Sequence, residues 1–372
     1  MRWACALSIA LAAGIAQARD HGDPSVHHAV GTPAKPSKIR ATQHKHVAKH
    51  MGSALTDDIH VMAWAQEAAP RLQLDPDWLH RTLAQAQRLP VVEKLVLPPA
   101  SPTAKDWAAY RARFIEPTRI QAGVRFWGRH QATLERAEKE FGVPAAIVVG
   151  IIGVETVYGQ NTGNFRLVDA LGTLAFHFPQ AHPRATERQA FFRSEFEQFL
   201  QLTARSGNDP LSVRGSYAGA MGLPQFMPSS WAKHAVDFDA DGRIDLFNSP
   251  ADAIGSVANY FKAFQWRTGM PTHYPVSLGP QTDIDGLLAP DILPTFSVNH
   301  FTAKGAALDG AALSHNGPLA LIELRNGSNA PSYVTGTENF YAITRYNWSS
   351  YYAMAVIELA EAVAREYMRA PQ

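Results

Sequence analysis

The chain of 372 residues is poor in cysteine, in net charge and in long hydrophobic runs, and each shortage excludes a class of protein. Its one cysteine, Cys5, has no partner for an intramolecular disulfide, so the fold depends on its core or on a metal. The net charge of +1 provides no overall basic field for nucleic-acid binding. Hydrophobic residues make up 46% and charged residues 18%, as in ordinary globular proteins.

The apolar run nearest the N-terminus extends from Trp3 to Ile15. It is too short for a transmembrane helix, which takes roughly 20 residues. Arg2 precedes it and Ala16-Gln17-Ala18 follows it as a small-residue cleavage site, so residues 1–18 are predicted to be a secretory signal peptide, with a signal anchor as the alternative. A lipid-anchoring cysteine would follow the run, whereas Cys5 does not, so we expect no lipid anchor.

Residues 19–55 hold few large apolar side chains and are rich in His, Lys, Pro and Gly. Such a segment cannot bury enough surface to fold, so we expect a disordered linker. The alternative is that its histidines bind a metal; they are His27, His28, His44, His46 and His50.

Most of the remaining chain has helical spacing and helix-capping residues, and one segment does not. Between residues 272 and 337, short runs such as Thr295–Val298 and Leu319–Leu324 are bounded by Gly, Pro, Asn and Asp, which predicts a small β subdomain. The predicted fold class is therefore mainly α with a small β subdomain (α+β). The predicted helices are Thr56–Ala69, one beginning at Asp75-Pro76, Pro117–Phe141, Ala145–Tyr158, Glu187–Ala204, Ala251–Gln265 and Tyr352–Met368.

Glu155 is the only charged residue between Gly142 and Phe165. Burial among apolar side chains disfavours a carboxylate and raises its pKa, which suits a general acid at neutral pH. The alternative is a structural glutamate paired with an arginine from elsewhere, such as Arg166 or Arg345.

Several blocks in the same order resemble the lytic murein transglycosylase B family over roughly residues 58–368. The segment Gly150–Gly159, which contains Glu155, is similar to the catalytic segment of that family. The other similar blocks are Tyr110-Arg111, Phe114-Ile115, Gly215–Gly222, Pro224–Ser230, Asn339–Tyr341, Thr344–Asn347 and Tyr352–Ala355.

The resemblance implies a goose-lysozyme-like helical core with a further helical lobe and an inserted β lobe, the glycan lying in a groove between them. We expect a helical lobe over 56–141, the catalytic core over 142–271, the β subdomain over 272–337 and a return to the core over 338–368. The implied location is the periplasm and the implied partner is the glycan strand of peptidoglycan. A monomer is expected, and proteins of cell-wall synthesis or remodelling are compatible partners.

The reaction implied by the resemblance closes the product sugar on itself as 1,6-anhydromuramic acid. Glycosidases ordinarily use two carboxylates, but the blocks around Glu155 contain no second one. A single Glu155 suffices if it protonates the bridging oxygen and then, as a carboxylate, takes the proton from the C6 hydroxyl that attacks C1. A hydrolytic muramidase and a non-catalytic peptidoglycan-binding protein are the competing hypotheses.

The resemblance also implies a set of substrate-binding residues. Two of them have structural alternatives: Ser216 can cap a turn in its glycine-rich loop, and Tyr260 can belong to the core face of its helix. The implied sugar-binding residues are Ser216, Gln225 and Asn347, and the implied groove tyrosines are Tyr110, Tyr260, Tyr346 and Tyr352.

The segment Asp237–Asp245 matches the beginning of an EF-hand calcium loop, with glycine at position 6. Position 12 is Asn248 instead of glutamate, and the resemblance implies an elongated loop closed by Asp252. A solvated acidic turn that caps the next helix is the alternative. Calcium would be structural, no organic cofactor is expected, and the predicted ligand residues are Asp237, Asp239, Asp241, Arg243 and Asp252.

Overall fold

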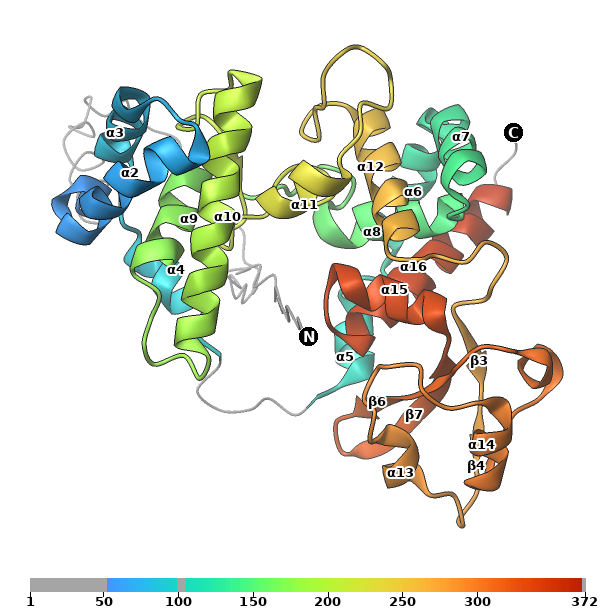
Figure 1. The fold of residues 1–372 in the computed structure, drawn as a ribbon. Helices are drawn as coiled ribbons and strands as arrows, with labels where there is room; N and C mark the ends of the chain where they lie inside the picture. The colour runs from blue at the N-terminus through green and yellow to red at the C-terminus, as the bar shows by residue number, and fades with distance from the viewer. Residues whose placement is uncertain (1–51, 99–104, 370–372) are drawn as a thin grey trace, which may run out of the picture.

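The computed structural model describes residues 52–98 and 105–369. The predicted signal peptide, Cys5 and almost all of the predicted linker, including its five histidines, lie outside these residues. Two groups of helices stand side by side, and a small β subdomain adjoins the second group (Figure 1). This arrangement confirms the predicted fold class. Within the described ranges, no helix is both long enough and apolar enough to cross a membrane.

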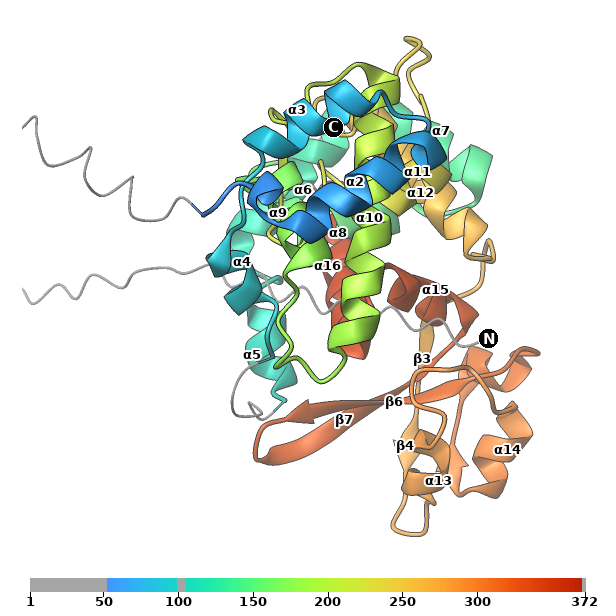
Figure 2. The same cartoon turned by 60° about the vertical axis from the view of Figure 1, so that its left-hand side comes forward.

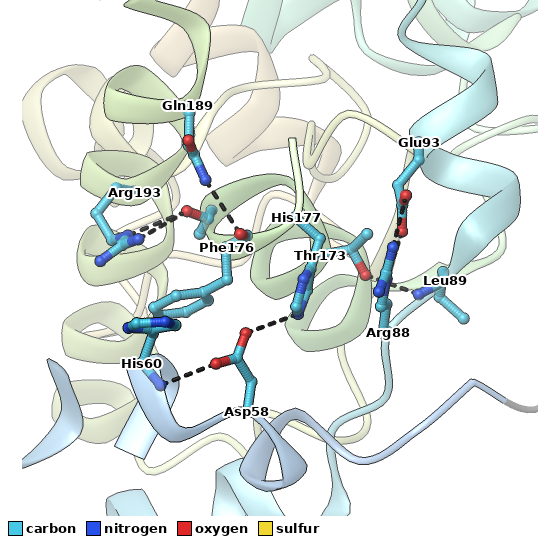
Figure 3. A network of polar contacts seen from close by, with 11 residues as sticks. Asp58, His60, Arg88, Leu89, Glu93, Thr173, Phe176, His177, Gln189 and Arg193 are labelled. Atoms are coloured by element: carbon cyan, nitrogen blue, oxygen red, sulfur yellow. Dashed lines mark hydrogen bonds and ion pairs between the residues drawn. The ribbon is translucent and has the colours of Figure 1, made fainter. Parts of the chain in front are cut away.

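In the first group, the N-terminal helices pack on two helices that come later in the chain, and Figure 2 shows α2 crossing in front of α10. The rings of Trp64, Phe176 and Phe196 pack together at this contact. Figure 3 shows polar contacts nearby. The Oδ2 of Asp58 lies 3.7 Å from the Nε2 of His177, and the backbone N–H of Leu89 donates to the hydroxyl of Thr173. The group comprises η1 (Leu55–Asp57), α2 (Ile59–Leu72), α3 (Pro76–Gln85), α4 (Pro90–Leu95), α9 (Leu167–Phe176) and α10 (Ala185–Ser206).

The helix starts in this group confirm the predicted cap of α3 and correct the predicted first residue of α2, which begins at Ile59 and not at Thr56. Asp75 accepts a hydrogen bond from the backbone N–H of Trp78, as predicted. The cap of α2 is Asp58, because its carboxylate accepts from the N–H of His60, while Thr56 lies in the preceding 3-10 turn. The predicted linker ends too late, since Leu55 is fully buried and Ala54 forms a β-bridge with Gln87.

The second group surrounds α8, whose residues are almost all buried, as its apolar sequence predicts. Helix α16 packs along α8 and α6, and α12 packs against α7 and α8. The group comprises α5 (Trp107–Ala112), α6 (Pro117–Arg129), α7 (Gln131–Phe141), α8 (Ala145–Thr156), α11 (Pro228–His234), α12 (Pro250–Ala263), α15 (Glu338–Tyr346) and α16 (Ser350–Arg369).

The single helix predicted over Pro117–Phe141 is wrong, because the chain turns at His130. This residue has φ −120° and ψ 22°, and its ring packs on Phe126 at 4.7 Å. The turn lets α6 pack on α16 while α7 packs on α12. The segment 56–141, expected as one lobe, is therefore divided: its first helices pack on α9 and α10, and α6 and α7 pack on the core.

Helices α8 and α16 approach so closely that glycine is required at position 150, where an added Cβ would meet the backbone of α16. A Cβ atom on Gly150 would lie 2.7 Å from the carbonyl oxygen of Val356, and one on Gly153 would lie 2.9 Å from Leu359. Both glycines precede Glu155 on α8, and Tyr352 lies at the start of α16. The close packing therefore sets the position of Glu155 relative to the aromatic residues of α16.

The β subdomain has its own small core, which includes Tyr274, Leu287, Phe301 and Leu321. Its antiparallel sheet has the strand order β3-β7-β6, and β4 pairs with β5. The short strands β1 (Phe165–Arg166) and β2 (Arg214–Gly215) pair elsewhere in the molecule. The subdomain comprises β3 (His273–Pro275), β4 (Ser277–Leu278), α13 (Ile284–Leu288), α14 (Val298–Ala303), β5 (Ala306–Ala307), η2 (Gly310–Ser314), β6 (Ala320–Asn326) and β7 (Asn329–Gly336).

One of the two predicted strands in this subdomain is confirmed. The run Leu319–Leu324 falls largely in β6. The run Thr295–Val298 is not a strand, because Phe296 forms only an isolated bridge with Leu319. Ser297 then caps α14 by accepting from the N–H of His300, so Val298 begins a helix.

Candidate active site

A pocket of about 260 Å³ opens between the two groups of helices, with Glu155 in its wall. Seven of the eight predicted catalytic and substrate-binding residues line it, although they come from five helices and two connecting loops. They are Tyr110 on α5, Glu155 on α8, Gln225 before α11, Tyr260 on α12, Tyr346 at the end of α15, Asn347 after it and Tyr352 on α16.

The carboxyl group of Glu155 has a hydroxyl partner and, in the part of the chain that the structure describes, no cationic one. The Tyr352 hydroxyl donates to its Oε1 at 2.5 Å. No lysine, arginine or histidine in the described ranges forms an ion pair with it. Neither arginine considered as a structural partner pairs with Glu155: Arg166 pairs with Asp169, and the guanidinium of Arg345 lies near aromatic rings.

Burial raises the pKa of Glu155 to about 7, and the Tyr352 hydrogen bond lowers it in part. Glu155 is also the next-to-last residue of α8, where the carbonyl end of the helix disfavours an added negative charge. The side chain can therefore hold or release a proton near neutral pH, which is the property required of a general acid and base.

Replacing Tyr352 with phenylalanine is expected to raise the pKa of Glu155 by about one unit above its value of about 7, because a hydrogen bond to the ionised form is lost. Carboxyl-carbon NMR of labelled glutamate would measure the change. The matched control is Tyr351→Phe on the same helix, since the Tyr351 hydroxyl bonds to the backbone of Arg325 instead. An unchanged titration in Tyr352→Phe would contradict the assignment of this hydrogen bond.

The backbone immediately after Glu155 is strained. Val157 and Tyr158 have φ values of 51° and 58°, in the left-handed region that β-branched and bulky side chains avoid. This turn directs the Tyr158 ring into the space above Gly123 and Gly153, where an added Cβ would lie 2.4 Å from its hydroxyl. The Thr156 hydroxyl donates to the carbonyl of Leu223, which joins the end of α8 to the Gln225 loop.

Gln225 and Asn347 each present an amide oxygen that can receive a hydrogen bond. The Nε2 of Gln225 donates to the carbonyls of Thr162 and Gly222, so its orientation is fixed and its Oε1 is left to accept. The Oδ1 of Asn347 is buried and has no hydrogen-bond partner among the described residues. A buried polar atom without a partner is costly, so the Asn347 oxygen is suited to hold an N–H or O–H group of a ligand, and the oriented Gln225 oxygen can accept a second one.

The predicted tyrosines form an aromatic wall with both structural and pocket-facing surfaces. The Tyr260 hydroxyl donates to the carbonyl of Arg345 at 2.6 Å, and the Tyr346 hydroxyl donates to that of Pro224. The rings of Tyr260 and Tyr346 pack at 4.9 Å, and those of Tyr346 and Tyr352 are stacked. Tyr260 is only 6% exposed, so it belongs to the core and the pocket wall together.

Ser216 is the predicted site residue that does not line the pocket. Its hydroxyl accepts the backbone N–H of Ala220 at 3.0 Å, and its own N–H donates to the carbonyl of Ala220. These bonds close the glycine-rich turn between β2 and Met221. Ser216 therefore has the capping contacts that were the structural alternative for it.

Glu195 on α10 is a pocket residue that the motifs do not reveal. It is 3% exposed, and burial raises its pKa. The backbone N–H and the hydroxyl of Ser229 donate to its two carboxylate oxygens, at 2.9 and 2.6 Å, which fastens the start of α11 to α10. The sequence does contain one signal for it, because Glu195 shares the buried helix face of Phe192, Phe196 and Phe199.

The loop that contains the EF-hand-like segment Asp237–Asp245 brings together some of the predicted metal ligands. Oxygen atoms of Asp237, Asp239 and Asp252 lie within 4.8 Å of one another, whereas Asp241 is not in this group. The Asp241 carboxylate instead accepts the backbone N–H of Arg243. The guanidinium of Arg243 cannot ligate a cation, so only its backbone carbonyl could serve. Asp252 is 1% exposed, and its oxygens accept the N–H groups of Phe238 and Asp245.

Comparison of the chain with known protein families shows the family to which it belongs. Residues 58–361 match the transglycosylase SLT domain. The chain belongs to this family. It is similar to the membrane-bound lytic murein transglycosylase B of Escherichia coli K12, with 38% identity over 343 residues and 90% of each chain covered. The resemblance inferred from the motifs is confirmed: the chain is a lytic murein transglycosylase.

Solved structures of other lytic transglycosylases support the same fold. SltB1 of Pseudomonas aeruginosa is 42% identical, with a TM-score of 0.73 over 82% of this chain and 98% of that one. Slt35 of E. coli, solved in complex with calcium, is 37% identical, with a TM-score of 0.73 over 88% and 99%. SltB3 of P. aeruginosa, solved with NAG-anhNAM-pentapeptide, is 27% identical, with a TM-score of 0.67 over 82% and 79%.

Proposed function

We propose that this lytic transglycosylase cleaves the MurNAc-β-1,4-GlcNAc bond of peptidoglycan without water and leaves 1,6-anhydromuramic acid ends. The observation that carries the proposal is the protonatable Glu155, which has a pKa of about 7 and no cationic partner in the described ranges. The complex of the relative SltB3 with an anhydromuramyl ligand agrees with such a product.

In the proposed reaction Glu155 acts first as an acid and then as a base. Its proton passes to the bridging oxygen as the bond from that oxygen to C1 breaks, and the electron pair stays on the departing oxygen. The carboxylate then takes the proton of the C6 hydroxyl while O6 forms a bond to C1. Glu155 is protonated at the end of the reaction, as it was at the beginning, so the reaction requires neither water nor a second carboxylate.

The second carboxylate in the pocket, Glu195, is not placed to act as a nucleophile. Both its oxygens are occupied by Ser229 and its side chain is almost fully buried. Its role in the proposal is to hold the start of α11, which forms one side of the pocket. The amides of Gln225 and Asn347 would receive sugar hydroxyl or N-acetyl N–H groups, and the tyrosine wall would pack on sugar rings.

The products of digestion in ¹⁸O-labelled water test this mechanism. Purified peptidoglycan is digested with the wild type, and the soluble fragments are analysed by mass spectrometry. Anhydromuramyl ends without ¹⁸O are expected, because the C6 hydroxyl and not water attacks C1. Reducing ends that carry ¹⁸O would instead establish a hydrolytic muramidase. If no soluble fragments are released, the remaining hypothesis is a non-catalytic peptidoglycan-binding protein.

We also propose a structural calcium ion at the carboxylates of Asp237, Asp239 and Asp252, by analogy with the calcium complex of Slt35. Oxygen ligands suit this ion, and the buried Asp252 would gain a counter-charge. Replacing chelator with millimolar calcium should raise the melting temperature by about 5 °C, since the ion binds only the folded state. Asp239→Asn should abolish the rise and Glu140→Gln, on the surface of α7, should keep it. A rise that persists in Asp239→Asn would refute this site.

We also propose that the protein is exported. The sequence of residues 1–18 supports cleavage after about Ala18 and a periplasmic, non-lipidated enzyme, which would place the protein beside its substrate. N-terminal sequencing of the protein recovered from the periplasm, together with its intact mass, distinguishes this form from an uncleaved or lipid-modified one.

A further inference from the structure

Arg345 lines the Glu155 pocket, and its guanidinium lies among three aromatic rings. Its guanidinium carbon lies 5.4 Å from the ring centre of Phe264, 5.8 Å from that of Tyr341 and 5.5 Å from that of Trp348. Its Nη1 is also 3.5 Å from the Tyr341 hydroxyl. Aromatic faces attract a cation and fix the side chain without neutralising its charge.

No carboxylate within residues 52–98 and 105–369 forms an ion pair with Arg345. Other arginines of this protein are paired, as Arg88 is with Glu93 and Arg166 with Asp169. Arg345 is partly buried, and a charged group with restricted access to water generally acquires a partner. Its positive charge is therefore available to a ligand in the pocket that it lines.

Lys233 on α11 adds a second available cation to the same pocket. Its side chain is exposed and forms no ion pair within the described chain. Glu195, the acid whose pKa it influences, already has both oxygens bound by Ser229. We call Lys233 and Arg345 the basic wall. The sugar rings of the glycan are uncharged, so a carboxylate elsewhere on the substrate is the group with the strongest electrostatic attraction to these two cations.

We propose that the basic wall binds a carboxylate on the side arm of the muramic acid residue. In peptide-bearing glycan this group belongs to the attached peptide, and in glycan stripped of peptide it is the free lactyl carboxylate. A planar guanidinium can bind either group through two parallel hydrogen bonds. This inference rests on the proposed function, because it assigns a further part of the same substrate to the same pocket.

The test compares wild type with Arg345→Gln on three soluble substrates: peptide-bearing glycan, the same glycan with its carboxyl groups converted to amides, and glycan stripped of peptide. On peptide-bearing glycan the variant should raise KM about tenfold, with a smaller effect on kcat, because a charge-assisted hydrogen bond to the bound substrate is lost. On amidated glycan wild type should already show this loss, and the substitution should add little.

The stripped glycan identifies the source of the carboxylate. Sensitivity of this substrate to Arg345→Gln points to the lactyl group, and insensitivity points to the peptide. Lys233→Gln should show the same pattern more weakly. Arg365→Gln, which removes the same charge from an exposed position of α16, is the matched control and should not change the ratio of the three activities.

An equal loss on all three substrates would overturn the proposal, because the effect would then not depend on a carboxylate. If Arg345→Gln does not fold, Arg345→Lys keeps the charge but not the paired hydrogen bonds, and should show an intermediate ratio. Calorimetric binding of peptide-bearing fragments to Glu155→Gln, with and without Arg345→Gln, gives the same comparison without turnover. Failure of the cleavage mechanism is thus distinguishable from failure of carboxylate recognition.

Discussion

Replacing Glu155 with glutamine is expected to lower kcat for the release of soluble fragments from peptidoglycan about 10³-fold. The amide has nearly the same shape and can still accept the hydrogen bond of Tyr352, so the pocket keeps its geometry. It cannot give a proton to the bridging oxygen or take one from the C6 hydroxyl, and positioned proton transfer contributes factors of roughly 10²–10⁴. Initial rates of fragment release, with circular dichroism to verify folding, measure the effect.

The matched control for this substitution is Glu195→Gln, which changes the other carboxylate of the same pocket. Its oxygens bind Ser229 and not a pocket ligand, so kcat should fall far less than in Glu155→Gln. Equal losses in the two variants would contradict the mechanism with one carboxylate and favour a pair of acids. Undiminished activity in Glu155→Gln would remove Glu155 from the reaction altogether.

The features that the sequence predicts correctly are those set by nearby residues. Glu155 is the one carboxylate in an apolar helical segment, so the neighbouring residues in the chain are enough to identify it as a candidate. The Asp75 cap and the burial of α8 likewise follow from local pattern, because caps and helical periodicity act within one or two turns. Family motifs then place seven predicted residues around one pocket, although the local pattern alone does not place them there.

The features that the sequence does not predict depend on contacts between distant residues. Apolar spacing continues through His130, and only the different packing partners of α6 and α7 explain the turn there. The bond between Glu195 and Ser229 joins residues 34 positions apart. The sequence leaves the role of Ser216 open, because a serine in a glycine-rich loop can cap a turn as readily as bind a ligand. In the fold its hydroxyl accepts the N–H of Ala220.

The burial that makes Glu155 a proton donor should also cost the protein stability, and the cost should depend on pH. The pKa of Glu155 is about 7 in the folded protein and about 4.5 in the unfolded chain, so between these values the folded state holds a proton that the unfolded state has released. Stability from this group is therefore complete below about pH 4.5 and is lost as pH rises through about 7, since the slope follows the difference in bound protons.

Glutamine has no proton to lose, so Glu155→Gln should match the wild type near pH 4.5 and become more stable than it as pH rises. The full difference above pH 7 should approach about 3 kcal/mol, which is the shift in pKa converted at about 1.36 kcal/mol per unit. Melting temperatures of both proteins between about pH 4.5 and 8.5 measure the divergence, and Glu140→Gln on the surface of α7 should run parallel to the wild type. A constant difference between Glu155→Gln and the wild type across this range would show that the Glu155 pKa is not raised. It would thereby remove the physical basis for its role as the acid, because a carboxyl group that is already ionised at about pH 5 has no proton to give at neutral pH.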